Sequence, residues 1–149
     1  MIVSDPLLLD TNVLVYAHNQ DSPFHSKSLS LVKGAIEGQF SGILAQQNLV
    51  EFYSVITDQR RITNPLPPLK AQEIFEDYLR LPFRIIVPNQ ETIKILSMFC
   101  QKKAVKNGQV FDAYLVATML SNQIKHIVTV NVNDFKSFTE IKVLSIEDF

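Results

Sequence analysis

The architecture of this chain can be traced from one short segment, Pro6-Leu7-Leu8-Leu9-Asp10-Thr11-Asn12. Its leucine run is too short for a helix and follows a proline, so it predicts a buried strand. Helical sequence continues directly after this strand, over residues 12–17. Asp10 is therefore expected at the carboxyl end of a buried first strand.

The rest of the chain alternates between helical and extended patterns. Ser22-Pro23 predicts an N-cap followed by proline at the first position of a helix that runs up to Gly38. Residues 46–58 are apolar around most of the helical circumference, which predicts a buried helix. A proline-rich surface loop is expected at residues 63–68. Further helices are predicted at residues 69–81, 90–103 and 109–122, and further strands at residues 40–45, 83–87, 126–130 and 142–144.

The order of these elements predicts an α/β fold. Helical segments separate most of the strands, and connections of that length are the crossovers that join parallel strands. A mostly parallel sheet of apolar strands needs helices on both faces. A chain of 149 residues fits one domain, so we predict a single α/β domain over residues 1–149.

Composition and charge exclude several classes of protein. The chain is 46% hydrophobic and 19% charged, which is typical of a folded protein rather than a disordered one. Its formal net charge of −1 provides no overall basic excess, so any contact with nucleic acid must be local. Cys100 is the only cysteine, which excludes an intrachain disulfide and a cysteine-based zinc cluster. No long apolar run is present, so we expect no membrane span and no secretion signal, and the single cysteine points to a reducing, cytoplasmic compartment.

Three solitary carboxylates are the candidates for chemistry. Asp10, Glu51 and Asp112 each lie in an apolar stretch without a nearby lysine or arginine. An ionised carboxylate in a low-dielectric site is costly unless it is paired or bound to a metal. One economical solution is that the three acids converge on a divalent ion at the carboxyl end of the first strand, where ligand sites of open α/β sheets form. Ligands that are all oxygen favour Mg²⁺ or Mn²⁺ over zinc.

Other polar residues are candidates for supporting roles. Asn131 and Asp134 follow the last long strand pattern, and Asp134 is a fourth candidate catalytic acid. The side chains of Thr11, Asn12 and Thr129 are able to hydrogen-bond a carboxylate or a phosphate. All of these residues are also good turn or capping residues, so the structural interpretation stays open for each of them.

Purely structural explanations compete for the acids as well. Asp10 alone is as readily a helix N-cap, and Glu51 alone more readily reaches solvent at the edge of a buried helix face. Asp112 is harder to explain in this way, because apolar residues share its helical face. The hypothesis of a shared site therefore depends on the coincidence of three acids.

Local positive charge is available for a polyanionic substrate. Two basic clusters flank the helices that carry Glu51 and Asp112, namely Arg60 with Arg61, and Lys102, Lys103 and Lys106. They are candidate phosphate contacts. The competing interpretation is that these side chains only solvate the surface and complement the helix dipoles.

These motifs, taken together and in order, resemble a known family. They are Leu-Leu-Asp10-Thr-Asn-Val-Leu-Val-Tyr-Ala, Leu-Val-Glu51-Phe-Tyr, Val-Phe-Asp112-Ala-Tyr-Leu-Val-Ala-Thr and Thr129-Val-Asn-Val-Asn-Asp-Phe135. The chain resembles PIN-domain ribonucleases, and in particular the VapC-type toxins of bacterial toxin–antitoxin pairs. The similarity extends over essentially the whole length.

The resemblance implies a three-layer α/β/α fold and an Mg²⁺- or Mn²⁺-dependent endoribonuclease. It places Asp10, Glu51 and Asp112 on the family acids, with Asp10 and Asp112 as direct metal ligands. Many members carry a fourth acid where this chain has Asn131, which leaves Asp134 as the nearest carboxylate. The resemblance also implies a neutralising antitoxin and a homodimer.

Three rival hypotheses remain at this level. A haloacid-dehalogenase-type phosphohydrolase also has an Asp after its first strand, but it needs a second Asp where this chain has Asn12. A degenerate nuclease fold that serves as a binding or scaffold module would be consistent with Asn131. A receiver-like signalling domain would need an acidic pair and a distal lysine that the sequence does not present at the expected strand ends.

Overall fold

A five-stranded parallel sheet forms the centre of the computed structural model, which describes residues 4–149. The strand order is β3-β2-β1-β4-β5, and every neighbouring pair is parallel. The strands are β1 (Leu7–Leu9), β2 (Gly42–Ala45), β3 (Arg84–Ile86), β4 (His126–Thr129) and β5 (Lys142–Ser145).

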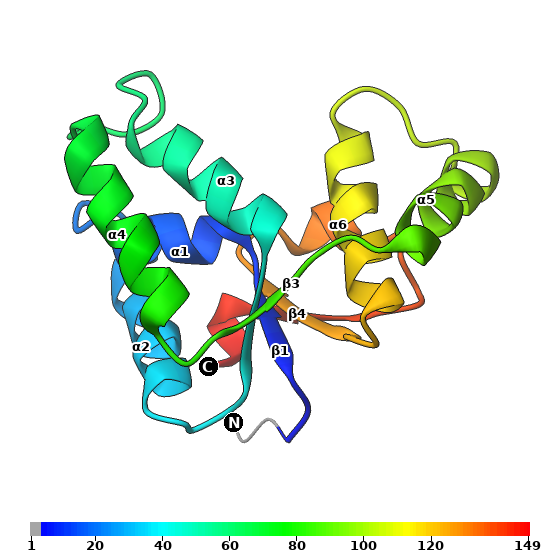
Figure 1. Cartoon of the computed structure of the whole chain (residues 1–149), viewed down its shortest axis with the longest axis horizontal. Coiled ribbons are helices and arrows are strands. Elements are labelled where there is room, and N and C mark those ends of the chain that lie inside the picture. The colour runs from blue at the N-terminus through cyan, green and yellow to red at the C-terminus, as the bar shows by residue number, and fades with distance from the viewer. Residues whose placement is uncertain (1–3) are drawn as a thin grey trace.

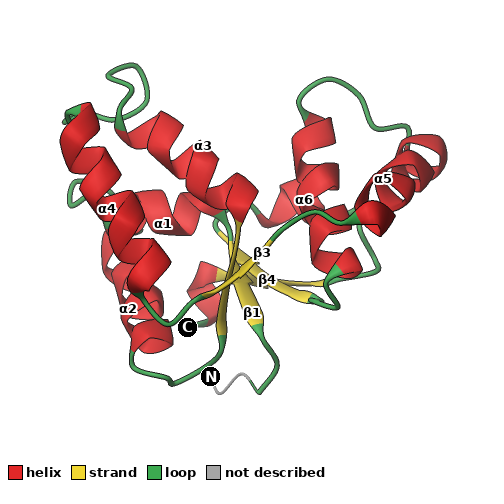
Figure 2. Cartoon of the chain, viewed as in Figure 1, coloured by secondary structure: helices red, strands yellow, loops and turns green. Residues whose placement is uncertain are grey.

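Six α-helices cover the sheet on two sides (Figure 1). They are α1 (Thr11–Ala17), α2 (His25–Ile36), α3 (Gln46–Ile56), α4 (Pro68–Arg80), α5 (Gln90–Lys103) and α6 (Gln109–Ser121). Two short 3₁₀ helices, Val132–Phe135 and Ile146–Asp148, follow β4 and β5. The predicted three-layer α/β/α class is confirmed, and helices α1 to α4 lie on the opposite side of the sheet from α5 and α6 (Figure 2).

The leucine run of β1 explains why both faces are covered. Leu7 and Leu9 belong to the hydrophobic core beneath α1 to α4, whereas Leu8 belongs to the core beneath α5 and α6. All three leucines are fully buried. Successive side chains of a strand point to opposite faces, so an uninterrupted apolar run requires a helical layer on each side.

The sheet has its topological switch point beside β1. From β1 the chain passes to β2 and β3 on one side and then crosses to β4 and β5 on the other. Connections therefore leave the carboxyl ends of β1 and β4 in opposite directions, and a crevice opens between them. Leu9, the last residue of β1, pairs with Val128, the last but one of β4. The residues that follow them, Asp10 and Thr129, therefore meet at this edge of the sheet.

Two local predictions need correction. Helix α2 begins at His25 rather than at Pro23, because Ser22 closes a turn in which its carbonyl accepts from the His25 amide at 3.1 Å. Helix α3 is not buried all around: Val50 is 63% exposed. An apolar circumference does not reveal which face lacks a neighbouring element. Within the described residues no helix is both long enough and apolar enough to span a bilayer.

Candidate active site

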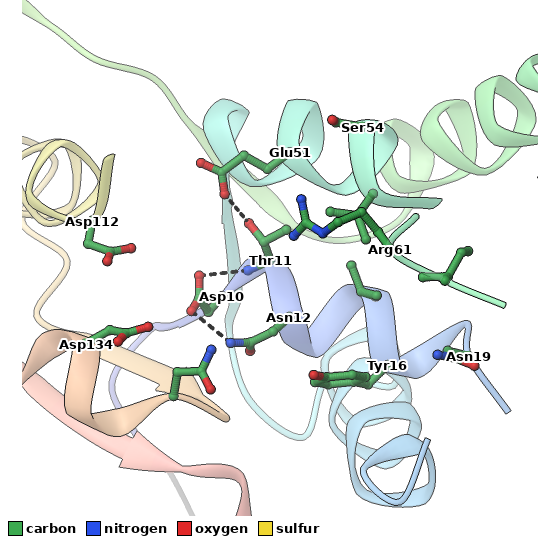
Figure 3. Close-up of a pocket in the computed structure, with 14 residues that line it drawn as sticks. Asp10, Thr11, Asn12, Tyr16, Asn19, Glu51, Ser54, Arg61, Asp112 and Asp134 are labelled. Carbon is green, nitrogen blue, oxygen red and sulfur yellow. Dashed lines mark hydrogen bonds between the residues drawn. The ribbon is translucent and has the colours of Figure 1, made fainter. Parts of the chain in front are cut away.

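A pocket of about 500 Å³ opens at the switch point, and all four predicted acids line it (Figure 3). Asp10 follows β1, Glu51 lies in α3, Asp112 lies in the first turn of α6, and Asp134 lies in the 3₁₀ helix after β4. The carboxylates are brought together from four segments that are far apart in the sequence. The predicted supporting residues Thr11, Asn12 and Asn131 line the same pocket.

Asp10 is held by hydrogen bonds on both of its oxygens. Oδ1 accepts from the Thr11 amide at 2.8 Å, and Oδ2 accepts from the Thr129 hydroxyl at 2.8 Å and from the Asn12 amide group at 3.3 Å. Asp10 is thus the N-cap of α1, as one of the competing interpretations proposed, and it also faces the pocket. The two roles are compatible because one oxygen caps the helix while the other bonds to Thr129.

Thr129 ties the ends of β1 and β4 together. Its hydroxyl is fully buried, donates to Asp10, and accepts from the Asn12 side chain at 3.1 Å and from the Asn131 amide at 3.0 Å. The side-chain oxygen of Asn12, Oδ1, accepts from the Val130 backbone amide at 3.2 Å. The Thr129 hydroxyl and the Asn12 side chain each donate and accept hydrogen bonds within this network. The network therefore fixes the direction of the Asp10 carboxylate.

Glu51 is also held on both oxygens. The Thr11 hydroxyl donates to Oε2 at 2.9 Å, and the Gln47 amide donates to Oε1 at 2.8 Å. The buried Asn48 donates to the Thr11 hydroxyl oxygen at 3.1 Å and accepts from the Ala45 amide at 2.9 Å. Since the hydroxyl oxygen receives the Asn48 proton, its own single proton is directed to Glu51.

Asp112 and Asp134 lie on the opposite wall and are held differently. Among the described residues neither carboxylate accepts a hydrogen bond from a side chain or from the backbone. Asp112 is positioned by the packing of α6, which places Ala113 and Val116 in the core. Asp134 is exposed at the mouth of the pocket.

Burial and mutual repulsion raise two of the acid pKa values. Burial raises the pKa of Asp10 to about 7, the negative charges of Asp112 and Glu51 add to the rise, and the hydrogen bonds from Thr129 and Thr11 partly oppose it. Burial raises the pKa of Asp112 to about 6, with contributions from Asp134 and Glu51. The negative charges of these acids raise one another's pKa, and within residues 4–149 none of the four pocket acids forms an ion pair.

The set of donors suits a hard divalent cation. The pocket offers carboxylate, amide and hydroxyl oxygens without sulfur or imidazole, and its crowded negative charge is the arrangement that a bound cation relieves. As the side chains are oriented, no three acidic, histidine or cysteine residues within 4–149 are grouped tightly enough to hold one ion. The oxygens of Asp10 and Glu51 instead accept the hydrogen bonds described above.

The basic residues predicted to bind RNA are distributed unevenly. Of the five, Arg61 lines the acidic pocket. Arg60 is bonded to Asp58, and both residues line a separate hollow. Lys102 and Lys106 are exposed outside the pocket.

Lys103 is engaged in holding the fold together. Its ammonium group contacts Glu140 at 3.1 Å, donates to the Ser137 carbonyl at 2.6 Å, and lies 5.5 Å from the ring centres of Phe99 and Phe138. These contacts tie α5 to the loop before β5. The position favours the competing interpretation of this side chain, as a structural cation rather than a phosphate contact.

Sequence reasoning missed two amides that support Glu51. Gln47 and Asn48 stand at the beginning of α3, directly after β2, where three consecutive amide residues occupy positions 46–48. A run of amides between a buried strand and a helix, at the same sheet edge as Asp10, was the available signal. The pairing of Asn48 with Thr11 crosses 37 residues and had no signal in the sequence.

An α/β domain with an acidic pocket at its switch point is the class that this fold and site define. The family model for the PIN domain matches residues 7–141, and the chain belongs to this family. Family membership replaces the haloacid-dehalogenase and receiver hypotheses.

Curated relatives with similar sequences carry the name VapC ribonuclease. Ribonuclease VapC24 of Mycobacterium tuberculosis is 26% identical over 89% of this chain and 90% of its own length. Ribonuclease VapC37 of the same species is 29% identical over 91% of this chain and 93% of its own length.

Solved structures confirm the fold. VapBC2 from Rickettsia felis, bound to a DNA fragment from its promoter, has a chain with a TM-score of 0.66 at 16% identity, covering 94% of this chain and 98% of that one. The structure of FitAB bound to an IR36 DNA fragment gives a TM-score of 0.67 at 16% identity, with 94% of each chain covered.

Proposed function

We propose that this chain is a divalent-metal-dependent endoribonuclease and the toxin of a VapBC-type toxin–antitoxin pair. The observation that carries the proposal is the convergence of Asp10, Glu51, Asp112 and Asp134 on one pocket, two of them with a raised pKa. The names of the curated relatives support the ribonuclease activity.

Asp10 and Asp112, with Glu51, are the residues that would hold Mg²⁺ or Mn²⁺. When bound, such an ion acidifies a coordinated water and offsets charge on a phosphodiester. The chain's own groups prepare the site: Thr129 aims the Asp10 carboxylate, and Thr11 aims that of Glu51. A preorganised carboxylate loses little entropy when it binds its ligand.

Asp134 and Asn131 have a different role in this proposal. Both line the pocket and lie in the segment that follows β4. The Asp134 carboxylate is able to accept a proton from water there, and the side-chain amide of Asn131 is able to orient that water. Because Asn131 is neutral where many family members carry an acid, the segment after β4 presents one carboxylate, that of Asp134, rather than two.

The partners follow from the same family membership. We propose RNA as the substrate, with Arg61 in the pocket and Arg60, Lys102 and Lys106 outside it as candidate phosphate contacts, while Lys103 is engaged within the fold. We also propose an antitoxin partner, because related structures are complexes such as a toxin–antitoxin complex from Klebsiella pneumoniae. A homodimer and a cytoplasmic location complete this proposal.

Cleavage of single-stranded RNA by the purified chain tests the proposal. We expect cleavage with Mg²⁺ or Mn²⁺, none with EDTA, and none by Asp112→Asn. Glu73→Gln is the matched control, because it removes an exposed carboxylate of α4 that is paired with Lys70 outside the pocket. Cleavage that persists in EDTA, or in both Asp10→Asn and Asp112→Asn, would contradict the proposal.

A degenerate binding or scaffold module is the second candidate. Asn131 and the absence of a tightly grouped metal-ligating trio within the described residues favour it. Such a module would bind divalent ions weakly and leave RNA intact under every metal condition. The same cleavage assay, combined with titration calorimetry of Mn²⁺, separates the two candidates.

A further inference from the structure

The pocket extends past the acids into a groove between α1 and α3. Its α1 wall is formed by Asn12 and Tyr16, which lie four residues apart on one helical face, and continues to Asn19 in the turn that follows α1. Its α3 wall continues from Glu51 to Ser54 at a spacing of three. The groove therefore runs along both helices, away from Asp10 and toward the loop that follows α3.

Arg61 reaches into this groove from the loop that follows α3. It is the basic residue among those that line the pocket, and within residues 4–149 no carboxylate lies within ion-pair distance of it. Figure 3 shows its guanidinium group lying over α1 and directed toward Thr11. The pocket thus holds a positive charge over α1 as well as the negative charges of the acids.

The neighbouring Arg60 provides a sharp contrast. Its guanidinium group makes two hydrogen bonds of 3.1 Å with Asp58 and faces a different hollow. Two adjacent arginines with the same charge therefore differ in their surroundings. One is neutralised within the chain, and the other faces the acidic pocket.

The backbone holds Arg61 in this position. The Asp58 carbonyl accepts from the Arg61 amide at 2.9 Å and from the Ile62 amide at 3.1 Å. Ile62 is partly buried against the core beneath α1 to α4. The anchored turn on one side and the apolar contact of Ile62 on the other hold the Arg61 backbone beside the groove.

We propose that this groove binds the nucleotide next to the scissile phosphodiester, and that Arg61 contacts its phosphate. The proposal rests on the proposed ribonuclease function. Phosphates recur at regular intervals along RNA, so a strand with one phosphate at the acids presents the next one further along the groove. A guanidinium group is suited to bind a phosphate through two parallel hydrogen bonds.

The groove walls fit the rest of a nucleotide. Tyr16, Asn19 and Ser54 offer hydroxyl and amide groups for ribose and base edges, while Val15 and Val55 provide an apolar floor. The Tyr16 ring lies along the groove in Figure 3. Single-stranded nucleic acid is recognised by this combination of aromatic surface and local positive charge.

Binding measured without cleavage is the first test. In the Asp112→Asn background, the affinity for a fluorescein-labelled random RNA pool of about ten nucleotides is followed by anisotropy as the salt concentration rises. We expect Arg61→Gln to weaken binding about tenfold and to reduce the salt dependence by about 0.7 in the log–log slope. Arg60→Gln should lose clearly less, and Arg80→Gln, in exposed α4, should match the parent.

Cleavage of backbone-modified RNA is the second test. A neutral methylphosphonate is placed in turn at each of the two linkages that flank the cleaved one. We expect one of these two positions to slow cleavage by the parent enzyme, and the same modification to cause no further loss in Arg61→Gln. Equal losses in parent and variant at both positions would overturn the proposed contact.

The two tests distinguish failure of this proposal from failure of the proposed function. If the chain cleaves RNA but Arg61→Gln and Arg60→Gln bind equally well, the groove assignment is wrong and the ribonuclease stands. If RNA is never cleaved but RNA binding depends on Arg61, the groove is an RNA-binding site and the proposed ribonuclease activity is wrong. Tighter binding of a polyglutamate peptide than of RNA, with the same dependence on Arg61, would assign the groove to a protein partner and overturn the proposal.

Discussion

The two walls of the acidic pocket are built in different ways. On the β1 and β4 wall, Asp10 accepts three hydrogen bonds, and Thr129 links it to Asn12. On the α6 wall, Asp112 is positioned only by the packing of its helix and has no hydrogen-bonding partner among the described residues. One carboxylate is fixed by a polar network, and the other is fixed by hydrophobic burial of its neighbours.

This contrast shows which physical effect controls the pKa of each acid. Burial raises the pKa of Asp10 to about 7 even though two hydrogen bonds act against the rise. Asp112 has no such bonds, yet its pKa rises only to about 6, because desolvation by burial is weaker there than at Asp10. Desolvation therefore outweighs hydrogen bonding in this pocket, and a cation would relieve both walls.

The largest effect is expected when either wall loses its carboxylate. Asp10→Asn and Asp112→Asn should each reduce RNA cleavage by more than the about 10- to 100-fold that is typical of a residue behind a metal ligand. Initial cleavage rates at saturating Mg²⁺ measure this loss. A variant of only one wall that retains full activity would show that the two walls do not act on the same ion.

The next effect concerns the hydrogen bonds that orient Glu51. Asn48→Asp removes the amide that donates to Thr11, so the Thr11 hydroxyl becomes free to donate to the new carboxylate instead of to Glu51. We expect a loss of about tenfold in cleavage rate at saturating Mg²⁺.

A matched variant shows whether this loss is specific. Asn64→Asp makes the same chemical change at an exposed position of the loop between α3 and α4, outside the pocket. It should leave the cleavage rate unchanged. Equal rates for Asn48→Asp and the parent would mean that Glu51 does not need Thr11 for its orientation.

A smaller effect on stability is expected from the polar network of Asp10. Thr129→Val keeps the shape of the side chain but removes its hydroxyl, which leaves Asp10 without one donor and the Asn12 and Asn131 donors without their acceptor. Loss of such buried partners costs about 1–3 kcal/mol. Urea unfolding measures this change in the free energy of unfolding, and Thr139→Val, at an exposed position, is the control. A loss of unfolding free energy no larger than that of the control would show that the Thr129 hydroxyl does not stabilise the network.

The smallest effect concerns how the folding stability of the metal-free protein depends on pH, which differs between the two walls. The pKa of Asp112 rises from 3.8 in the unfolded chain to about 6 in the folded chain. Below the lower value both states hold the proton, and above the higher value the folded state carries the full cost of the charge. Stability from this group therefore falls as the pH rises through this window.

Asp112→Asn removes this cost and should raise the melting temperature in EDTA at about pH 8 by about 3 °C, which corresponds to about 1 kcal/mol after solvent screening is allowed for. No rise is expected at about pH 4. Asp10→Asn should gain less, because its new amide group meets the Thr129 and Thr11 donors. Differential scanning fluorimetry checks both, and a lower melting temperature for Asp112→Asn at the higher pH would indicate that its charge is stabilising.

The order of elements was predictable because it depends on local pattern. The prediction for α5, residues 90–103, agrees with the structure at both ends, because Asn89 is a side-chain N-cap and Ala104 adopts a left-handed conformation after two lysines. The beginning of α2 was misplaced, because Ser22-Pro23 forms a turn as readily as a helix start. Local capping chemistry alone does not choose between these outcomes.

The acids of the candidate site were predictable for a different reason. Asp10, Glu51 and Asp112 stand out in the sequence because each is a charge in an apolar segment, and charges in such segments need a partner. The roles of Gln47 and Asn48 were not visible, because an amide beside a strand has many possible partners. Nor did the sequence separate Arg61 from Arg60, which are adjacent and identical in type.

The sequence alone therefore determined which segments form strands and helices and which carboxylates lack a local counter-charge. These properties follow from periodicity and solvation, and both are written in neighbouring residues. Only the tertiary structure decided that the four acids share one pocket, that Thr129 and Asn48 orient two of them, and that Arg61 rather than Arg60 faces the groove. Those outcomes depend on the directions of side chains across the switch point of the sheet, which are set by packing between elements far apart in the chain.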